Sequence, residues 1–344
     1  MPTHLRYEPY ERTTDVPNVV VDGSPNPSTV LTLTHWPGFA APTGLAADLS
    51  AQMAFRYLDR GRCLHQPADV VTNNHFDQDG LVGVFVLTRP DEAVLRRDLL
   101  QDLAAAGDFA TYRDRRAARL SMVVAAYVDP VRSPLAPLPA EYGESSALLY
   151  RELLGRLPEL LDRPEAHRPL WAEEDGELSA SEAAIARGDV VIEEHPEVDL
   201  TVVTLGDKVR DGGWAGHRFA GRRFEGVHPM ALHNATDRLA LLLVQGRRYR
   251  FTYRYETWVQ YRSRPTRPRV DLTALATRLT SEESGTTIWR ADPVQDLTPQ
   301  LGTVDGAESS LAPSRVVAHV TAHLRDAPPT WDPYRIGDPG GAAA

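Results

Sequence analysis

The sequence predicts a two-domain α/β protein. The expected N-terminal domain has a parallel sheet flanked by helices, and the smaller C-terminal domain is α+β with antiparallel strands. Three observations lead to this class. A chain of 344 residues can bury two ordinary cores. Apolar strand-like runs alternate with helical patterns up to residue 205, as in βαβ units. Beyond it, two alternating runs meet at Gly246-Arg247, a hairpin pattern.

The predicted N-terminal domain covers residues 1–205, and residues 1–17 form an arm. Strands are expected at residues 19–21, 29–34, 70–71 and 198–205. Helices are expected at residues 44–61, after residue 77, at 90–127 with a break at 107–109, and near 145–161 and 173–187. Because a strand–helix–strand unit of this length joins parallel strands, the strands at 29–34 and 70–71 should be parallel. The proline-rich stretch 129–142 is interpreted as a linker or long loop.

The predicted C-terminal domain covers residues 206–333. A glycine-rich stretch at 206–226 marks its start, and helices are expected near 270–280 and 314–324. The tail, residues 334–344, is expected to be disordered because it ends in a short run of glycine and alanine.

Composition excludes several classes of function. The single cysteine, Cys63, excludes a disulfide framework and a cysteine-based zinc site. There is no apolar run long enough for a membrane span and no apolar core of a secretory signal, so a cytoplasmic protein is expected. Lys208 is the only lysine, a bias typical of a GC-rich bacterial genome, and no phosphate-binding loop ending in Gly-Lys-Ser/Thr is present.

Charge is unevenly distributed along the chain. The formal net charge is −10, which argues against indiscriminate binding of nucleic acid. Residues 247–278 nevertheless contain nine arginines and only two acidic residues. Such a segment suits an anionic ligand, so the expected partner is a phosphorylated small molecule or a nucleotide. Whether the protein forms a homodimer is left open.

The most informative stretch is residues 69–85, where His75, Asp77, Asp79 and Gly80 follow a short apolar strand. Carboxylate and imidazole groups together suit a divalent metal such as Mn²⁺, and two carboxylates in one turn can each reach a different ion of a pair. The alternative is an aspartate-rich turn that caps the next helix.

Two further residues fit the same site. His35 follows the strand at 29–34, and the carboxyl ends of parallel strands share one sheet edge, so His35 should lie near the aspartate turn. Asp108 follows Gly107 and is interpreted either as a metal ligand or as the N-cap of the following helix. For His228 and His233, five residues apart, helix capping or a core hydrogen bond is the simpler interpretation.

The run VVTNNHFDQDGLVGVF resembles the first motif of the DHH phosphoesterase superfamily, in which a strand ends in His/Asn-x-Asp-x-Asp-Gly before a helix. A second stretch, YRSRPTRPRVDLTALATRLTSEESG at residues 261–285, is similar to the substrate-binding part of that family's C-terminal domain. The resemblance covers about 40 residues. It implies two domains with the active site in the cleft between them, a Mn²⁺ pair in the N-terminal domain, and hydrolysis of a phosphoester or phosphoanhydride. Mg²⁺ and Zn²⁺ are alternatives to Mn²⁺.

The resemblance also implies roles for particular residues. Asp77 and Asp79 would be metal ligands, and His75 would be a ligand or an acid/base group, so these three form the candidate catalytic set. The candidate substrate-binding residues are Arg262, Arg264, Arg267 and His233. The chain departs from the family because it has no Asp-His-His triplet, and residues 281–285 replace the glycine-rich, histidine-ending loop. Either the activity has been lost or other residues supply the missing ligands, the candidates being His35, Asp48 and Asp108.

Two alternatives remain open. Residues 76–80 also look like the aspartyl nucleophile motif of haloacid-dehalogenase-type phosphatases, and residues 206–211 are similar to their late acidic motif. Against this, Leu81 stands where that family has threonine, and its lysine would have to be Lys208. The other alternative is a non-catalytic protein that binds a nucleotide or metabolite on a degenerate DHH-like fold.

Overall fold

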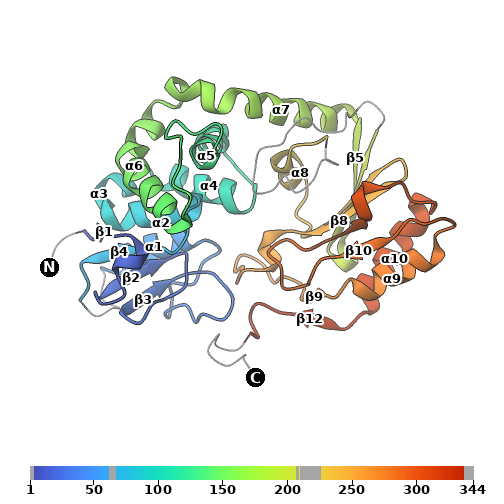
Figure 1. Ribbon diagram of the computed structural model, residues 1–344, viewed down its shortest axis with the longest axis horizontal. Coiled ribbons are helices and arrows are strands. Elements are labelled where there is room, and N and C mark those ends of the chain that lie inside the picture. The colour runs from blue at the N-terminus through green and yellow to red at the C-terminus, as the bar shows by residue number, and fades with distance from the viewer. Residues whose placement is uncertain (1–3, 62–66, 207–208, 210–225, 337–344) are drawn as a thin grey trace. The chain divides into compact units, whose positions relative to one another are not determined.

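The computed structural model describes residues 4–61, 67–206, 209 and 226–336 (Figure 1). Contacts divide the chain into two compact units. The first contains Met1–Gly176 together with Tyr261–Ser263, and the second contains Glu177–Gln260 and Arg264–Ala344. The division falls inside helix α7 (Arg168–Arg187).

The first unit contains a four-stranded sheet in which every strand pair is parallel. Its strands, β1, β2, β3 and β4, are Arg6–Tyr7, Asn18–Val21, Thr29–Leu33 and Val70–Thr72. The order across the sheet is β1-β4-β2-β3, so β2 separates the two strands that were predicted to be parallel. Because β2 lies inside the sheet and is covered by helices, all four of its residues are buried.

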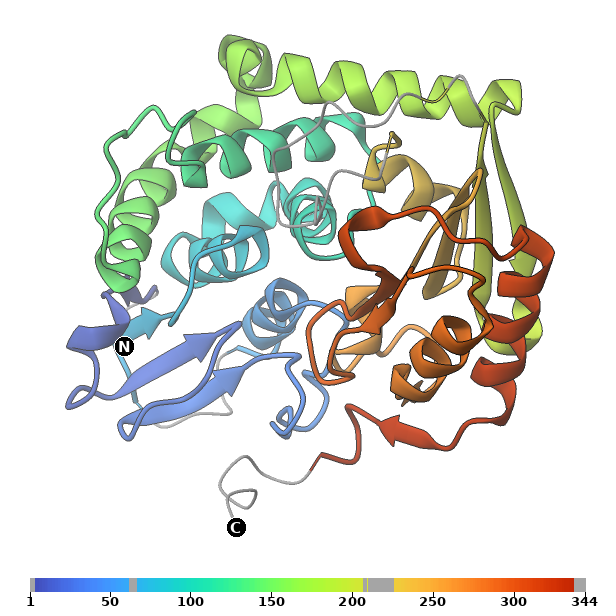
Figure 2. The ribbon, with the colours of Figure 1, turned by 45° about the vertical axis from the view of Figure 1, so that its right-hand side comes forward.

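Helices cover this sheet (Figure 2). Helices α1 to α6 are Ser50–Asp59, Gln78–Thr88, Pro90–Val94, Arg97–Asp108, Arg115–Val128 and Tyr142–Asp162. Helices α1 and α2 pack on β2, α4 packs on α2, and α5 packs on α4. Ten of the eleven residues of α2 are buried, which explains its almost uninterrupted apolar sequence.

The predicted helix break at residues 107–109 is confirmed. Helix α4 includes Gly107 and ends at Asp108, with Phe109 as its C-cap, and α5 begins at Arg115. A Cβ atom on Gly107 would lie 2.4 Å from the Cβ of Gln78, so glycine is required here for the close approach of α4 to α2. The N-cap of α5 is Asp114, whose carboxylate accepts a hydrogen bond from the Arg116 amide. The interpretation of Asp108 as the N-cap of the following helix is therefore wrong.

The second unit contains a six-stranded mixed sheet and a two-stranded antiparallel sheet. The larger sheet has the order β10-β11-β8-β7-β6-β5, in which β6 and β7 are parallel and the other pairs antiparallel. Its strands β5 to β8, β10 and β11 are Val190–His195, Leu200–Leu205, Ala240–Gln245, Arg248–Tyr253, Trp289–Ala291 and Gln300–Thr303. In the smaller sheet, β9 (Arg269–Val270) pairs with β12 (Pro329–Trp331).

The core of the second unit lies on one face of the larger sheet. Helices α8, α9 and α10 are Pro229–Ala235, Thr273–Glu282 and Pro313–Asp326. Alternate residues of β7 and β8 point into one apolar cluster with α9 and α10, as the period of two along a strand requires.

The predicted hairpin is confirmed, and Gly246 has a φ of 58° in its turn. The remaining helical turns are 3₁₀ helices at Tyr10–Arg12, Pro164–His167, Pro196–Val198, Tyr255–Thr257 and Val304–Gly306.

The predicted α/β class, with a helix-flanked parallel sheet and a second α+β part, is confirmed. Strands β1, β5, β10, β11 and β12 were not predicted, because they are short or carry charged residues at their exposed positions. The prediction that residues 1–17 form an arm is wrong, because β1 pairs with β4 at the edge of the parallel sheet. Strands β5 and β6 precede residue 206 and pair in the larger sheet of the second unit. Most of the predicted boundary stretch 206–226 and of the predicted disordered tail lies outside the described residues.

Within the described ranges, no helix is long and apolar enough to cross a membrane.

Close packing of α2 on β2 provides a test of this arrangement. A Cβ atom on Gly83 would lie 2.3 Å from Val21 Cγ1, and a valine methyl group cannot swing away. We expect Gly83→Ala to lower the free energy of unfolding by about 1–3 kcal/mol, measured by urea denaturation. The matched control is Gly155→Ala, an exposed position in α6 with nothing within 4 Å of the added methyl group. That variant should be neutral or stabilised by up to about 1 kcal/mol, and equal losses in both would contradict the packing argument.

Candidate metal site

The carboxyl edge of the parallel sheet gathers acidic and imidazole side chains. Asp22 follows β2, His35 follows β3 after one residue, and the turn with His75 follows β4. The end of α4 adds a further carboxylate to the same place. Six side chains meet there: Asp22, His35, His75, Asp77, Asp79 and Asp108. All six belong to the first unit.

His35 directs one ring nitrogen at three carboxylates. Its Nδ1 atom is hydrogen-bonded to the backbone carbonyl oxygen of Asp48, and a carbonyl can only accept, so Nδ1 carries the proton. In the neutral ring the Nε2 lone pair then points into the cluster. The nearest carboxylate oxygens of Asp22, Asp108 and Asp79 lie 3.5, 3.4 and 3.9 Å from Nε2, respectively. A lone pair facing carboxylate oxygens in a buried site is repulsive unless a cation or a second proton separates them.

Asp22 is the centre of the cluster. It has a φ of 53°, a conformation that aspartate tolerates better than most residues and that turns the chain sharply after β2. Its Oδ1 atom accepts a hydrogen bond of 2.9 Å from Ser50 Oγ, and its Oδ2 atom lies 3.3 Å from His75 Nε2. Two potential ligand sets share it, Asp22 with His35 and Asp79, and Asp22 with His75 and Asp77. Within each set the ligand atoms lie within 4.8 Å of one another.

Asp79 has a structural role in addition to its place in the cluster. Its two oxygens accept hydrogen bonds from the Ser50 and Ala51 amides, at 2.7 and 2.9 Å, and so satisfy the N-terminus of α1. The side chain is fully buried. Burial and the neighbouring Asp22 and Asp77 carboxylates raise the pKa of Asp79 well above its ordinary value, although the two amides oppose this. A nearby cation would favour the ionised form.

The turn after β4 combines helix capping with the cluster. Asp77 is the N-cap of α2, its Oδ1 accepting a hydrogen bond of 2.8 Å from the Gly80 amide, as the capping alternative predicted. Its Oδ2 atom remains directed at the cluster, 3.0 Å from His75 Nε2. Burial lowers the pKa of the His75 imidazole, but Asp77 and Asp22 raise it further, so its net pKa lies well above the usual value. The indole of Trp36 lies beside this imidazole, with ring centroids 5.1 Å apart.

The donor set fits a divalent metal ion. Four carboxylates and two imidazoles converge in a largely buried place. Burying several carboxylates close together is costly, so this much negative charge favours the binding of protons or cations. Mixed oxygen and imidazole ligation suits Mn²⁺, and Mg²⁺ or Zn²⁺ less specifically. Because Asp22 is common to both sets, it would be a ligand whichever set holds an ion.

Of the predicted metal ligands, the structure brings His35, His75, Asp77, Asp79 and Asp108 together but not the Asp48 carboxylate. Asp48 Oδ1 instead accepts hydrogen bonds from the Arg262 and Ser263 amides, and Oδ2 accepts one from the Ser263 hydroxyl. Only the backbone carbonyl of Asp48 serves the cluster, by orienting His35. The prediction that Asp48 is a ligand is therefore not supported by the geometry.

The predicted substrate-binding residues are dispersed. Arg264 contacts Asp199 and the carbonyl oxygen of Asp237, and Arg267 donates to the carbonyl oxygen of Glu197, all within the second unit. His233 lies in helix α8 of the same unit, and His228 caps that helix by accepting from the Met230 amide, as predicted. Arg262 packs with the first unit, where it lines a pocket beside helix α1.

Asp22 was missed by the sequence analysis. The signal was present, because Asp22 follows the apolar run Val19–Val21 and precedes a glycine, as Asp79 precedes Gly80. An aspartate at the carboxyl end of a parallel strand lies at the same sheet edge as His35 and is therefore a candidate for the same site. The haloacid-dehalogenase alternative stays a prediction, because most of residues 206–211, including Lys208, lie outside the described residues.

Comparisons with known proteins give a family but no activity. A profile described as a family of unknown function (DUF6687) matches residues 3–335. No curated protein and no solved structure matched the chain.

The central position of Asp22 gives a sharp test of metal binding. We expect the wild-type protein to hold one or two Mn²⁺ ions per chain after loading and desalting, measured by mass spectrometry of the metals. Asp22→Asn keeps the side-chain shape and tolerates the positive φ, but removes the charge shared by both ligand sets. It should weaken Mn²⁺ binding at least about tenfold at both positions. Asp114→Asn, which keeps the N-cap of α5, is the control, and equal metal content in all three proteins would refute the site.

The pKa shifts predict how pH affects the metal-free protein. Asp79 and His75 both have folded-state pKa values raised above those of the unfolded chain. Their protonation therefore stabilises the fold, for His75 fully below its unfolded pKa of 6.5, and this stabilisation is lost as pH rises through the folded values. We expect the metal-free protein to lose thermal stability as pH rises above 6.5, while saturating Mn²⁺ removes most of that loss. Stability that rises with pH in the metal-free protein would contradict this assignment.

Proposed function

The chain belongs to the DUF6687 family, and we propose that it is a metal-dependent hydrolase of a phosphoester or phosphoanhydride. The observation that carries the proposal is the orientation of His35. The hydrogen bond to the Asp48 carbonyl fixes both the tautomer and the ring orientation, so that the Nε2 lone pair faces three buried carboxylates, an arrangement that suits a cation. The resemblance to the DHH phosphoesterase motif supplies the reaction class.

The chain's residues would hold the ions as two sets with a shared member. One set is Asp22, His35 and Asp79, with Asp108 beside His35, and the other is Asp22, His75 and Asp77. A bound pair of divalent ions supplies Lewis-acid stabilisation of the attacking and leaving oxygens in phosphoryl displacement. The protein's own contribution is rigidity, because Asp79 is fixed by two amides of α1 and Asp77 by the first turn of α2.

Exposure indicates the side from which substrate would enter. The side chains of Asp22, His35, Asp79 and Asp108 are between 0 and 1% exposed, whereas those of His75 and Asp77 are 18 and 8% exposed. A substrate phosphate would therefore approach over His75 and Asp77. The packed Trp36 ring keeps the His75 imidazole in place on this side, where its Nε2 serves as a metal ligand.

Metal-dependent turnover is the test of the proposal. Protein purified without added metal should hydrolyse little, and loading with Mn²⁺ should produce activity on at least one of bis(p-nitrophenyl) phosphate, p-nitrophenyl phosphate and pyrophosphate. Asp77→Asn keeps the helix cap, because asparagine caps as well as aspartate, but removes the ligand charge. We expect it to lower kcat at least about a hundredfold with little change in stability, whereas Asp114→Asn should leave kcat unchanged.

The outcomes separate the alternatives. Tight Mn²⁺ binding without turnover on any of the three substrates would favour a non-catalytic nucleotide or metabolite sensor over a hydrolase. Full activity in Asp77→Asn would remove the cluster from the mechanism. Asp79→Ala is a poor probe, because it would leave the buried Ser50 and Ala51 amides without their acceptor and so cost stability as well as metal.

A further inference from the structure

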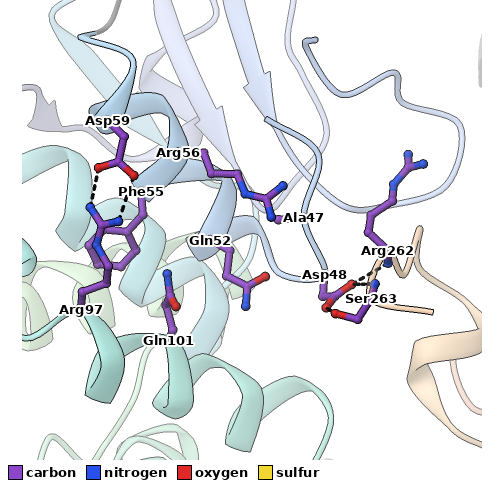
Figure 3. Close-up of a pocket in the computed structure, with 10 residues that line it drawn as sticks. All are labelled: Ala47, Asp48, Gln52, Phe55, Arg56, Asp59, Arg97, Gln101, Arg262 and Ser263. Atoms are coloured by element: carbon purple, nitrogen blue, oxygen red, sulfur yellow. Dashed lines mark hydrogen bonds and ion pairs between the residues drawn. The ribbon is translucent and has the colours of Figure 1, made fainter. Parts of the chain in front are cut away.

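The first unit contains a pocket of about 400 Å³ beside helix α1 (Figure 3). Its lining comes from α1, from α4, from the segment that precedes α1 and from the segment Tyr261–Ser263, which packs with this unit. Three α1 residues that line it, Gln52, Arg56 and Asp59, are spaced i, i+4 and i+7 and therefore share one helix face. The amides of Ser50 and Ala51 bind Asp79 at the other, buried side of the same helix start. The pocket is thus distinct from the metal cluster.

Arginines dominate the charge of this pocket. Arg56, Arg97 and Arg262 line it, against Asp48 and Asp59. Both carboxylates are already engaged: Asp48 accepts from the Arg262 and Ser263 amides, and Asp59 forms a two-point ion pair with Arg97 at 2.9 and 2.6 Å. The close-up shows these two pairs on opposite sides of the pocket (Figure 3).

Arg56 is the charge best placed to receive a ligand. Its guanidinium donates to the backbone carbonyl oxygen of Ala46, which carries no charge, and its side chain is exposed. Across the described part of the chain, no acidic side chain forms an ion pair with Arg56. A guanidinium held at one edge in this way keeps further N–H donors for a second, planar acceptor such as a phosphate.

We propose that this pocket is a binding site for a phosphorylated small molecule, separate from the metal cluster. Guanidinium forks match phosphate oxygens, and the Gln52 and Gln101 amides can both donate to and accept from the hydroxyl groups or base edge of such a molecule. A volume of about 400 Å³ lies in the range of small-molecule sites and exceeds what an inorganic phosphate would fill. The proposal does not depend on hydrolysis, because no residue of either metal-ligand set lines the pocket.

The test is binding to the metal-free protein in the presence of EDTA. A thermal-shift panel of nucleoside monophosphates, sugar phosphates and inorganic phosphate identifies the tightest probe, and calorimetry then gives its Kd. We expect saturable binding of one organic phosphate per chain, with inorganic phosphate weaker. Absence of binding by every member of the panel would overturn the proposal.

Two variants with opposite expected effects locate the binding. Arg56→Gln should raise the Kd at least about tenfold, because it removes a charged two-point contact. Asp59→Asn should lower the Kd, because it removes a negative charge while Arg97 keeps its position over the Phe55 ring, 4.7 Å from the ring centroid. A folding defect would not tighten binding, so the pair distinguishes a direct effect from a structural one.

The controls separate this site from the metal cluster. Arg60→Gln changes an arginine of the same chain segment that also donates to a backbone carbonyl, that of Thr43, but does not line the pocket. It should leave the Kd unchanged, as should Asp22→Asn in the cluster. Loss of binding in Asp22→Asn but not in Arg56→Gln would place the ligand at the cluster and overturn the proposal, whatever the result of the hydrolysis assays.

Discussion

The buried carboxylate of Asp79 is the interaction on which the first unit's site depends. It lies in the first turn of α2, yet its oxygens bind the first amides of α1, so a single side chain fixes the starts of two helices against the sheet. Helix N-termini favour negative charge, which offsets part of the cost of burying an ionised group. The remaining cost is the reason why a cation is expected among the surrounding carboxylates. Asp79 therefore both holds the start of α1 and belongs to the candidate metal site.

Asp48 extends this coupling beyond the cluster. Its carbonyl orients His35. Its carboxylate accepts hydrogen bonds from the amides of Arg262 and Ser263, two residues that line the pocket beside α1. The residues before α1 thus serve two places with different chemistry, an acidic one that suits cations and an arginine-rich one that suits anions. Both depend on Asp48 through these hydrogen bonds, so a displacement of the Asp48 backbone should affect both.

The sequence predicted more of the first unit than of the second, for a physical reason. Strands β2 and β3, helices α1 and α2, and the turn with Asp77 and Asp79 carry strong apolar runs or capping residues, so local patterns reveal them. Strands β10 to β12 are only three or four residues long, so they carry little sequence pattern and form because neighbouring strands supply their hydrogen bonds. The break predicted at residues 107–109 is present, but Gly107 itself lies inside α4, because the helix approaches Gln78 closely there and that contact is not visible in the sequence.

By itself, the sequence determined the α/β class, the hairpin of the second unit and five of the six cluster residues, because strand ends and capping turns are written in local residue order. Only the tertiary structure decided that Asp22 stands at the centre, that Asp48 points away, and that Arg264 and Arg267 bind the carbonyls of their own unit. Those outcomes depend on β2 lying between β3 and β4 and on which amide or carbonyl lies within reach of each side chain. These contacts join residues that are far apart in the chain, so they cannot be predicted from the spacing of residues in the sequence.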